Sequence, residues 1–405
     1  MASLLRHRIQ SLVRSNRHFY SILSPNSTTP LSSKEKTKAA FSLLKFENNP
    51  EKIVEICQEA TLIPETHLDR IVFSMAISKL SKSNNFSYIK QFIDEFRSSR
   101  PDLRSSERFA AHAIILYGQA GMIDDALRVF TEYHADIVGN SSSTGSVKAL
   151  NALIFAFILA KDFKEVNRIY LEFPKLYNIE PNLQTYNNVA KAFCESGSSS
   201  SCYSVLAEMD RKGVKPNATT FQYLLSGFYM EEKEEDVGKV LEMMKEKYRI
   251  GQSVATCNIR IKSLCKLKRS TEAKALLDGM ISRGMKPNIN TFSHLIFGFC
   301  LEGNLEEAQR LFRSMLNSGC KPDAQCYFTL VHYLCEGEDF ETALLLCQES
   351  VEKGWVPNYG TMEPLVNGLA RVGKVQEAKE LVGKMKERFT WNVSRWDEVE
   401  AGLPQ

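Results

Sequence analysis

The chain has 405 residues, of which 43% are hydrophobic and 24% charged, and its formal net charge is +3. The apolar content is sufficient for a continuous core, and the modest numbers of Gly (21) and Pro (13) exclude a disordered or collagen-like chain. The longest purely apolar run, residues 152–160, is about half as long as a bilayer-spanning helix requires, so we expect no membrane insertion.

The first 34 residues contain no Asp or Glu. Their basic residues are Arg6, Arg8, Arg14 and Arg17, which on a helix lie opposite an apolar face. An acid-free, Arg- and Ser-rich amphipathic start is typical of an organellar transit peptide, and we expect residues 1–34 to direct the protein to the mitochondrial matrix, with cleavage near 19–20. A plastid destination is less favoured, and a basic arm that is retained and binds nucleic acid is the alternative.

The transit segment accounts for the positive charge of the chain. The first 20 residues contribute +4 of a total of +3, which leaves the remainder near −1. Proteins that bind nucleic acid through bulk electrostatics are usually strongly basic. Any contact with RNA must therefore come from locally placed side chains.

A proline followed by Asn or Asp recurs along the rest of the chain. These prolines are Pro181, Pro216, Pro287, Pro322 and Pro357, spaced by 35, 71, 35 and 35 residues. The double spacing contains one further unit, which ends at residues 250–253 without a proline. A constant period in the range of about 20–50 residues is typical of a solenoid, in which each unit packs only on its neighbours.

The pattern predicts an all-α, right-handed α-solenoid of about nine or ten helix-turn-helix repeats of roughly 35 residues. Residues 35–69 are interpreted as a degenerate N-terminal repeat or cap, and residues 394–405 as a C-terminal tail. The repeat array occupies 70–393, in units 70–106, 107–146, 147–182, 183–217, 218–253, 254–288, 289–323, 324–358 and 359–393.

The unit 289–323 shows the pattern within one repeat. Thr291 is expected to cap a first helix, which residues 302–304 interrupt, and Gly319 is expected to end the second helix. An alanine recurs at one place in the second helix, where a small side chain would let the two helices approach closely. The alanines are Ala126, Ala273, Ala308, Ala343 and Ala378.

Several segments carry a family resemblance. They are RKGVKPN (211–217), SRGMKPN (282–288), NSGCKPD (317–323), EKGWVPN (352–358), QTYNNVAKAFC (184–194) and NTFSHLIFGFC (290–300). These segments resemble the pentatricopeptide repeat family of plant organelles. Uniform units of 35 residues further resemble its P-type branch, and the short members of plant mitochondrial ribosomes are the most similar group.

The resemblance implies that the array binds single-stranded RNA, about one base per repeat. In the family, the fifth and the last residue of a repeat together recognise the base. Asparagine at both places suits a pyrimidine, which applies to Asn151 with Asn182, Asn187 with Asn217, and Asn258 with Asn288. Ser293 with Asp323 suggests a purine.

Other repeats depart from the family's pattern. Gln222 with Ser253, Phe328 with Asn358, and Glu363 indicate no base, and Ser74 and Ala111 lack clear partners. The candidate phosphate contacts, near the end of the first helix, are Lys82, Lys266 and Arg371. The same place elsewhere holds Leu159, Glu195, Met230, Leu301 and Glu336. Because cations occupy a minority of these positions, we expect modest affinity for free RNA.

No residues indicate catalysis, a cofactor or a metal site. Cys194, Cys265, Cys300 and Cys335 recur at one place in the first helix and are expected to pack there. The pairs Asp124–Asp125 and Glu306–Glu307 fit the starts of second helices, where they complement the helix dipole. His112, His294 and His332 are isolated, and residues 231–236 are expected to form a solvated turn.

We therefore expect a non-catalytic RNA-binding repeat protein that acts as an adaptor on the mitochondrial ribosome or another ribonucleoprotein, binding mRNA or rRNA. The alternatives are a transcript-specific RNA processing or stability factor, and a scaffold that binds only proteins.

Overall fold

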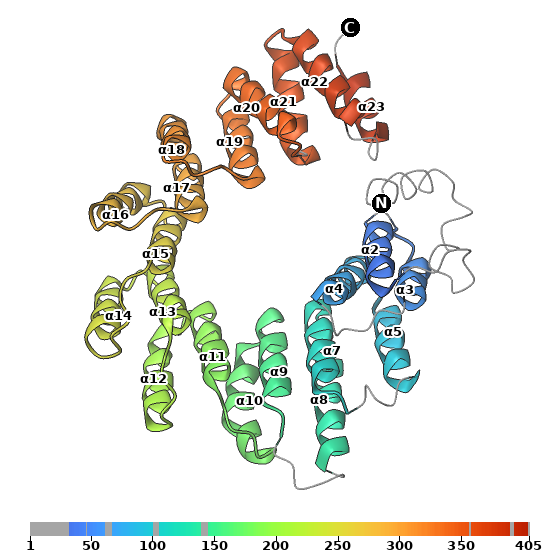
Figure 1. Cartoon of the computed structure of the whole chain (residues 1–405), viewed down its shortest axis with the longest axis vertical. Coiled ribbons are helices and arrows are strands. Elements are labelled where there is room, and N and C mark those ends of the chain that lie inside the picture. Colours follow the sequence, from blue (N-terminus) through green and yellow to red (C-terminus); the bar gives the residue numbers. More distant parts are fainter. Residues whose placement is uncertain are drawn as a thin grey trace. The chain divides into compact units, whose positions relative to one another are not determined.

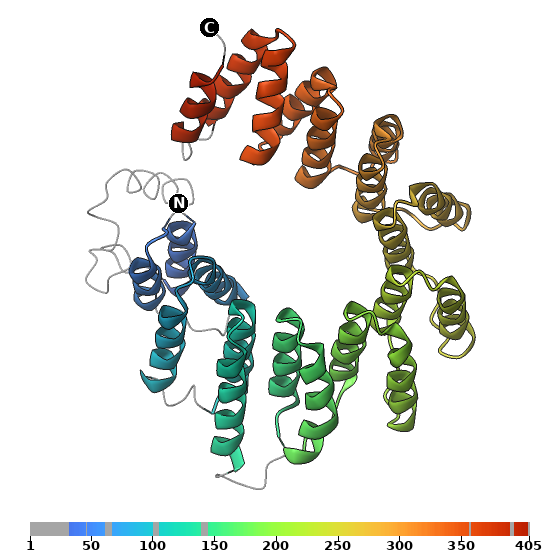
Figure 2. The ribbon, with the colours of Figure 1, turned by 180° about the vertical axis from the view of Figure 1, so that it is seen from behind.

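The computed structural model describes residues 32–45, 47–60, 67–99, 105–138, 145–355, 358–388 and 393–403, and all regular structure within these ranges is helical (Figures 1 and 2). This confirms the predicted all-α class. The chain divides into two compact units, 1–216 and 217–405. Among the described helices, none is both long and apolar enough to cross a bilayer. Almost all of the predicted transit peptide lies outside the described residues.

The N-terminal unit is a series of helix pairs. Its first helices are α2 (Ser33–Leu44), α4 (His67–Lys82), α7 (Glu107–Ala120), α9 (Val147–Leu159) and α11 (Leu183–Glu195). Its second helices are α3 (Pro50–Glu59), α5 (Phe86–Ser99), α8 (Ile123–Val138), α10 (Phe163–Leu176) and α12 (Cys202–Arg211), the last preceded by the short 3₁₀ helix η2 (Ser199–Ser201). Within this unit, each first helix contacts its own partner, and α2, α4, α7 and α9 also contact the first helix of the next pair.

The C-terminal unit repeats this arrangement. Its first helices are α13 (Ala218–Met230), α15 (Val254–Lys266), α17 (Ile289–Leu301), α19 (Ala324–Glu336) and α21 (Tyr359–Arg371). Its second helices are α14 (Glu234–Glu246), α16 (Ser270–Ser282), α18 (Leu305–Asn317), α20 (Phe340–Glu352) and α22 (Val375–Arg388). Figure 1 shows α13, α15 and α17 following one another in a row from which α14 and α16 project. A last helix, α23 (Val393–Ala401), packs on α22 where the sequence had indicated only a tail.

The recurring alanine lies in the core of each helix pair. Ala126, Ala273, Ala308, Ala343 and Ala378 all have no exposed surface. This confirms the expected use of a small residue where the second helix meets its neighbours. The first turns of α8 and α18 contain the predicted acidic pairs, Asp124–Asp125 and Glu306–Glu307.

Two local predictions were wrong. Thr291 is not the cap of its helix, because Asn288 is the N-cap of α17. Thr291 lies at the third helical position, where its hydroxyl accepts a hydrogen bond from the backbone amide of Asn288. The acidic run 231–236 is not wholly a turn, because α14 begins at Glu234. Two of its carboxylates form ion pairs within the unit, Glu231 with Lys233 at 2.6 Å and Glu234 with Arg269 at 2.5 Å.

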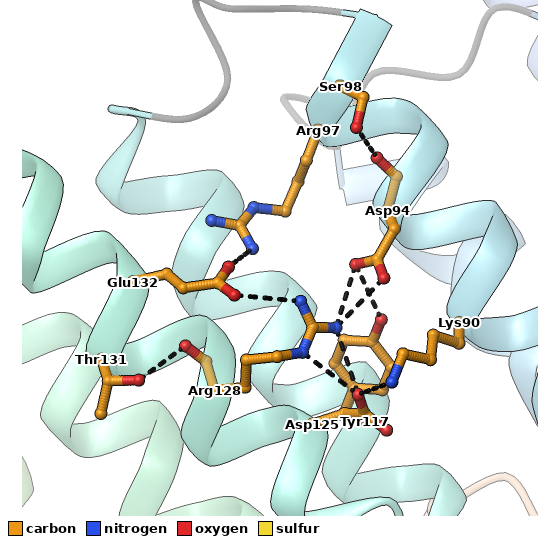
Figure 3. A network of polar contacts seen from close by, with 9 residues as sticks. All are labelled: Lys90, Asp94, Arg97, Ser98, Tyr117, Asp125, Arg128, Thr131 and Glu132. Carbon is orange, nitrogen blue, oxygen red and sulfur yellow. Dashed lines mark hydrogen bonds and ion pairs between the residues drawn. The ribbon is translucent and has the colours of Figure 1, made fainter.

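A network of charged groups joins the second helices α5 and α8 (Figure 3). Nη2 of Arg128 lies 3.1 Å from Oδ1 of both Asp94 and Asp125, and its Nη1 lies 3.3 Å from Oε1 of Glu132. Glu132 also binds Arg97, a residue of α5 that is 8% exposed. The guanidinium of Arg128 therefore balances several carboxylates at one contact between neighbouring repeats.

Candidate nucleic-acid interface

In the eight repeats from 70–106 to 324–358, the last residue is the N-cap of the next first helix. Its side-chain oxygen accepts a hydrogen bond from the backbone amide three residues later, which an N-cap must do to satisfy the helix end. The caps are Ser106 of α7, Ser146 of α9, Asn182 of α11, Asn217 of α13, Ser253 of α15, Asn288 of α17, Asp323 of α19 and Asn358 of α21. Helix capping therefore restricts these positions to short polar residues.

In the repeat 147–182, the fifth and last residues are hydrogen-bonded to each other. Nδ2 of Asn151 donates to Oδ1 of Asn182 over 3.2 Å, and Oδ1 of Asn151 accepts from the Thr185 hydroxyl over 2.7 Å. The same hydroxyl accepts from the backbone amide of Asn182 at 3.1 Å. Thr185, which is fully buried, thus connects the first helix of one repeat to the cap of the next.

The repeat 254–288 contains the same three-residue arrangement. Nδ2 of Asn258 donates to Oδ1 of Asn288 over 3.0 Å, and the Thr291 hydroxyl donates to Oδ1 of Asn258 over 2.7 Å. The backbone amide of Asn288 donates to the Thr291 hydroxyl over 3.1 Å. Matching distances in two separate repeats indicate that the arrangement follows from these residues and not from one local environment.

The cap determines which group of the terminal asparagine is free. Because Oδ1 of Asn182 and of Asn288 accepts from the helix end, the amide cannot be flipped, and Nδ2 remains as a hydrogen-bond donor. Both terminal asparagines are exposed, whereas Asn258 is only 6% exposed and uses both of its polar atoms within the protein. Asn258 therefore positions the side chain of Asn288, and Asn288 is the residue that can contact a ligand.

Of the other predicted pairs, Asn187–Asn217 spans the two units of the chain, and Ser293–Asp323 differs from this arrangement. Asn187 is buried in α11 of the N-terminal unit, and Asn217 caps α13 of the C-terminal unit. The hydroxyl of Ser293 donates to the carbonyl oxygen of Ile289 over 2.7 Å and forms no hydrogen bond with Asp323. Asp323 caps α19 through one carboxylate oxygen, and its side chain is exposed.

The candidate phosphate contacts share one position in the fold. Lys82, Lys266 and Arg371 are the last residues of α4, α15 and α21, and all three are exposed. The residues that replace them also end first helices, and two of these, Leu159 and Met230, are apolar and 41% and 50% exposed. Cationic side chains therefore end three of these first helices, and apolar or acidic side chains end the other five.

Within the described ranges, no three His, Cys, Asp or Glu side chains gather as metal ligands would. Cys265, Cys300 and Cys335 are buried, and burial raises the pKa of Cys265 to about 11 and of the other two to about 12. These thiols stay protonated at neutral pH, as packing residues would. Cys194 is only partly buried.

Sequence reasoning missed the threonine that connects Asn151 with Asn182 and Asn258 with Asn288. Its signal is an Asn-x-x-Thr spacing, found at 182–185, 217–220, 288–291 and 358–361. The spacing corresponds to a capping box, in which the cap and the third helical residue bond to each other's backbone. In α19 this third position is Cys326, whose thiol lies 3.0 Å from the Ser293 hydroxyl.

The stacked helix pairs with capped repeat ends define an α-helical repeat protein, and comparisons with known proteins identify its family. PPR repeat models match residues 255–285, 283–316 and 364–388, and a PPR repeat family model matches residues 181–230. The mitochondrial pentatricopeptide repeat-containing protein At1g11630 of Arabidopsis thaliana is 50% identical over 409 residues, which cover 100% of this chain and 99% of that protein. The chain belongs to the pentatricopeptide repeat family, as its sequence motifs predicted.

More distant relatives were also found. The small ribosomal subunit protein mL103 (rPPR7) of Arabidopsis thaliana is 28% identical, over 96% of this chain and 93% of that protein. The crystal structure of the pentatricopeptide repeat protein PPR10 from maize matches 92% of this chain and 66% of that chain, with a TM-score of 0.41 and 16% identity.

Proposed function

We propose that this protein is a non-catalytic RNA-binding adaptor of the P-type branch, working in the mitochondrial matrix. The observation that carries the proposal is the repeated Asn-Asn-Thr arrangement. In Asn151–Asn182–Thr185 and Asn258–Asn288–Thr291, an exposed amide donor is held in one orientation by a helix cap and by a buried partner. Such fixed polar groups are what recognition of a base edge requires, because single-stranded RNA is read on its Watson–Crick edge.

The hydrogen-bonding group that remains free at the repeat end determines which base the repeat prefers. The Nδ2 donor of Asn182 and Asn288 suits an acceptor, such as N3 of cytosine or a carbonyl oxygen of uracil. Asp323 offers a carboxylate oxygen instead, which suits the N1–H donor of guanine. These assignments agree with a pyrimidine at the two asparagine pairs and a purine at Ser293–Asp323.

The ribosome is the most consistent place of action. Few repeats place a cation at the end of the first helix, so phosphate contacts alone give weak binding, and a larger particle would supply further contacts. The full-length similarity to mL103 of the small ribosomal subunit supports this assignment, and the name of the 50% identical relative supports mitochondria.

Crosslinking in isolated mitochondria tests the proposal. The tagged protein is crosslinked to RNA with ultraviolet light, the bound RNA is sequenced, and a sucrose gradient is run in parallel. Reads on ribosomal RNA with co-migration in a ribosomal peak are expected. Absence from ribosomal fractions at low salt, with one sharp footprint on a transcript, would instead establish an RNA processing or stability factor, which the well-formed asparagine pairs also favour. Recovery of no RNA would indicate a protein scaffold.

A further inference from the structure

The face that carries the fifth residue of each repeat continues along the first helix. Residues four and eight positions later lie on the same face of an α-helix. On α15 these are Lys262 and Lys266, after Asn258. On α17 they are Phe297 and Leu301, after Ser293.

Phe297 is an unusually exposed aromatic residue for its place. Its side chain remains 38% exposed, although the residues beside it, Ile296 and Gly298, are buried. Its ring centroid lies 6.3 Å from that of Tyr333 on α19, with the two planes 73° apart. Tyr333 is the tenth residue of its repeat, and the tenth residue of the preceding repeat is Gly298. The edge-to-face contact between Phe297 and Tyr333 is therefore specific to this pair of repeats.

The lysines of the neighbouring helix α15 are available for an anion. Lys262 and Lys266 are exposed, and neither forms an ion pair with another described residue. The pKa of His294 on α17 is lowered to about 4, first by burial and then by the positive charges of these two lysines. An exposed aromatic ring and unpaired cations therefore lie on neighbouring first helices, next to the pair Asn258–Asn288.

The N-terminal unit also has an aromatic residue and a lysine at the ninth positions of two adjacent repeats. Lys191 of α11 lies with Nζ 4.9 Å from the centre of the Phe155 ring of α9, and both residues are ninth in their repeats. The ninth positions of adjacent repeats are thus close enough to contact a common ligand.

On the basis of the RNA-binding function above, we propose that Phe297 stacks on a nucleobase of the bound RNA and that Lys262 binds a neighbouring phosphate. Stacking on aromatic side chains combined with cations along the backbone is how proteins hold single strands without reading their sequence. The ring lies one helical turn from the base-recognition position of its own helix, which is within reach of an adjacent nucleotide. Contact with a protein partner would cover Phe297 but would not require unpaired lysines on the neighbouring helix α15.

The contact is tested by binding of fluorescent oligo(U), oligo(C) and oligo(A) of about 20 nucleotides to the full protein. Phe297→Leu removes the ring but keeps an apolar side chain, and it should lower affinity roughly 5- to 100-fold, by a similar factor for all three RNAs. Phe297→Tyr should retain affinity. Lys262→Gln should reduce the slope of log K against log salt by about 0.7, whereas Phe297→Leu should leave that slope unchanged.

Controls separate this inference from the proposed function. Leu316→Ala alters an apolar residue of the second helix α18 that is 43% exposed, and it should bind like the parent. If the parent protein binds none of the RNAs, the proposed function itself fails. If Asn288→Ala weakens binding while Phe297→Leu does not, only the stacking inference is overturned. It is also overturned if Phe297→Leu keeps its RNA affinity but no longer co-sediments with ribosomes, which would assign the ring to a protein contact.

Discussion

Asn258 donates its side-chain amide to Oδ1 of Asn288 over 3.0 Å, and the same oxygen caps helix α17. One side chain therefore ends a repeat, begins a helix and presents a donor to the solvent. Because the cap and the exposed group belong to one amide, the stability of the repeat and its choice of base are coupled. Substitutions that preserve the cap but change the free group can separate the two.

Asn288→Asp should change base preference without weakening the fold. A carboxylate caps a helix as well as an amide does, so we expect a stability change within about 0.5 kcal/mol. The outward donor becomes an acceptor, and preference at this repeat should move from cytosine towards uracil or guanine, whose ring nitrogens carry a hydrogen. Binding to RNAs that differ at one base, together with urea unfolding, measures both effects.

Asn288→Ala is the matched control for that exchange. It removes the cap as well as the free donor, and should destabilise the protein by about 1 kcal/mol. It should also weaken binding to all bases at that position. Equal base preference in the Asp variant and the parent would contradict recognition by this group.

Thr291→Val should destabilise the protein by roughly 1–3 kcal/mol. The hydroxyl is fully buried and donates to Oδ1 of Asn258, which is itself only 6% exposed, so the variant leaves an acceptor without its donor. Thr291→Ser keeps the hydroxyl and should cost clearly less. Urea unfolding midpoints of the two variants give the comparison, and equal midpoints would show that this hydrogen bond contributes little.

Thr291 also shows how much of the structure could be predicted from the sequence. The proline period predicted the helix pairs, and the recurring alanines predicted buried contacts, because both depend on regular packing that repeats in every unit. The role of Thr291 was assigned wrongly, since Thr is itself a common N-cap and the sequence alone does not indicate whether Asn288 or Thr291 begins the helix. The link from Thr291 to Asn258 spans 33 residues and depends on how neighbouring repeats pack, so spacing within one repeat could not reveal it.

Arg128→Met should destabilise the N-terminal unit by about 1–2 kcal/mol. Its side chain is 31% exposed, so the loss should lie between the values for surface and buried ion pairs. Arg310→Met is the control, because Arg310 binds Glu306 and Glu307 on α18 with its side chain 60% exposed, and it should cost less than about 1 kcal/mol. Urea unfolding at neutral pH tests the order, which a larger loss for Arg310→Met would contradict.

The same network predicts a pH dependence. Burial raises the pKa of Glu132, but hydrogen bonds and charges from Arg97 and Arg128 outweigh it, and the pKa lies below the ordinary value of 4.5. A lowered pKa in the folded state gives stability that is present above the unfolded value and is lost as the pH falls through the folded value. The stability difference between the parent and Arg128→Met should therefore shrink below pH 4.5, as measured by thermal unfolding across an acid series. A constant difference would argue against this contribution from Glu132.

Gly118→Ala should destabilise the contact between α7 and α9. A Cβ atom at Gly118 would lie 2.5 Å from Cβ and 2.6 Å from Cα of Ala156, so the two first helices would have to separate. Overpacking of this kind costs about 1–3 kcal/mol, which outweighs the roughly 1 kcal/mol gained from alanine's helix propensity. Gly238→Ala in α14 is the matched control, because nothing lies within 4 Å of its added Cβ. That variant should be more stable by about 0.5–1 kcal/mol, and opposite shifts of the two urea midpoints would show that close approach of first helices, and not helix propensity, requires glycine at position 118.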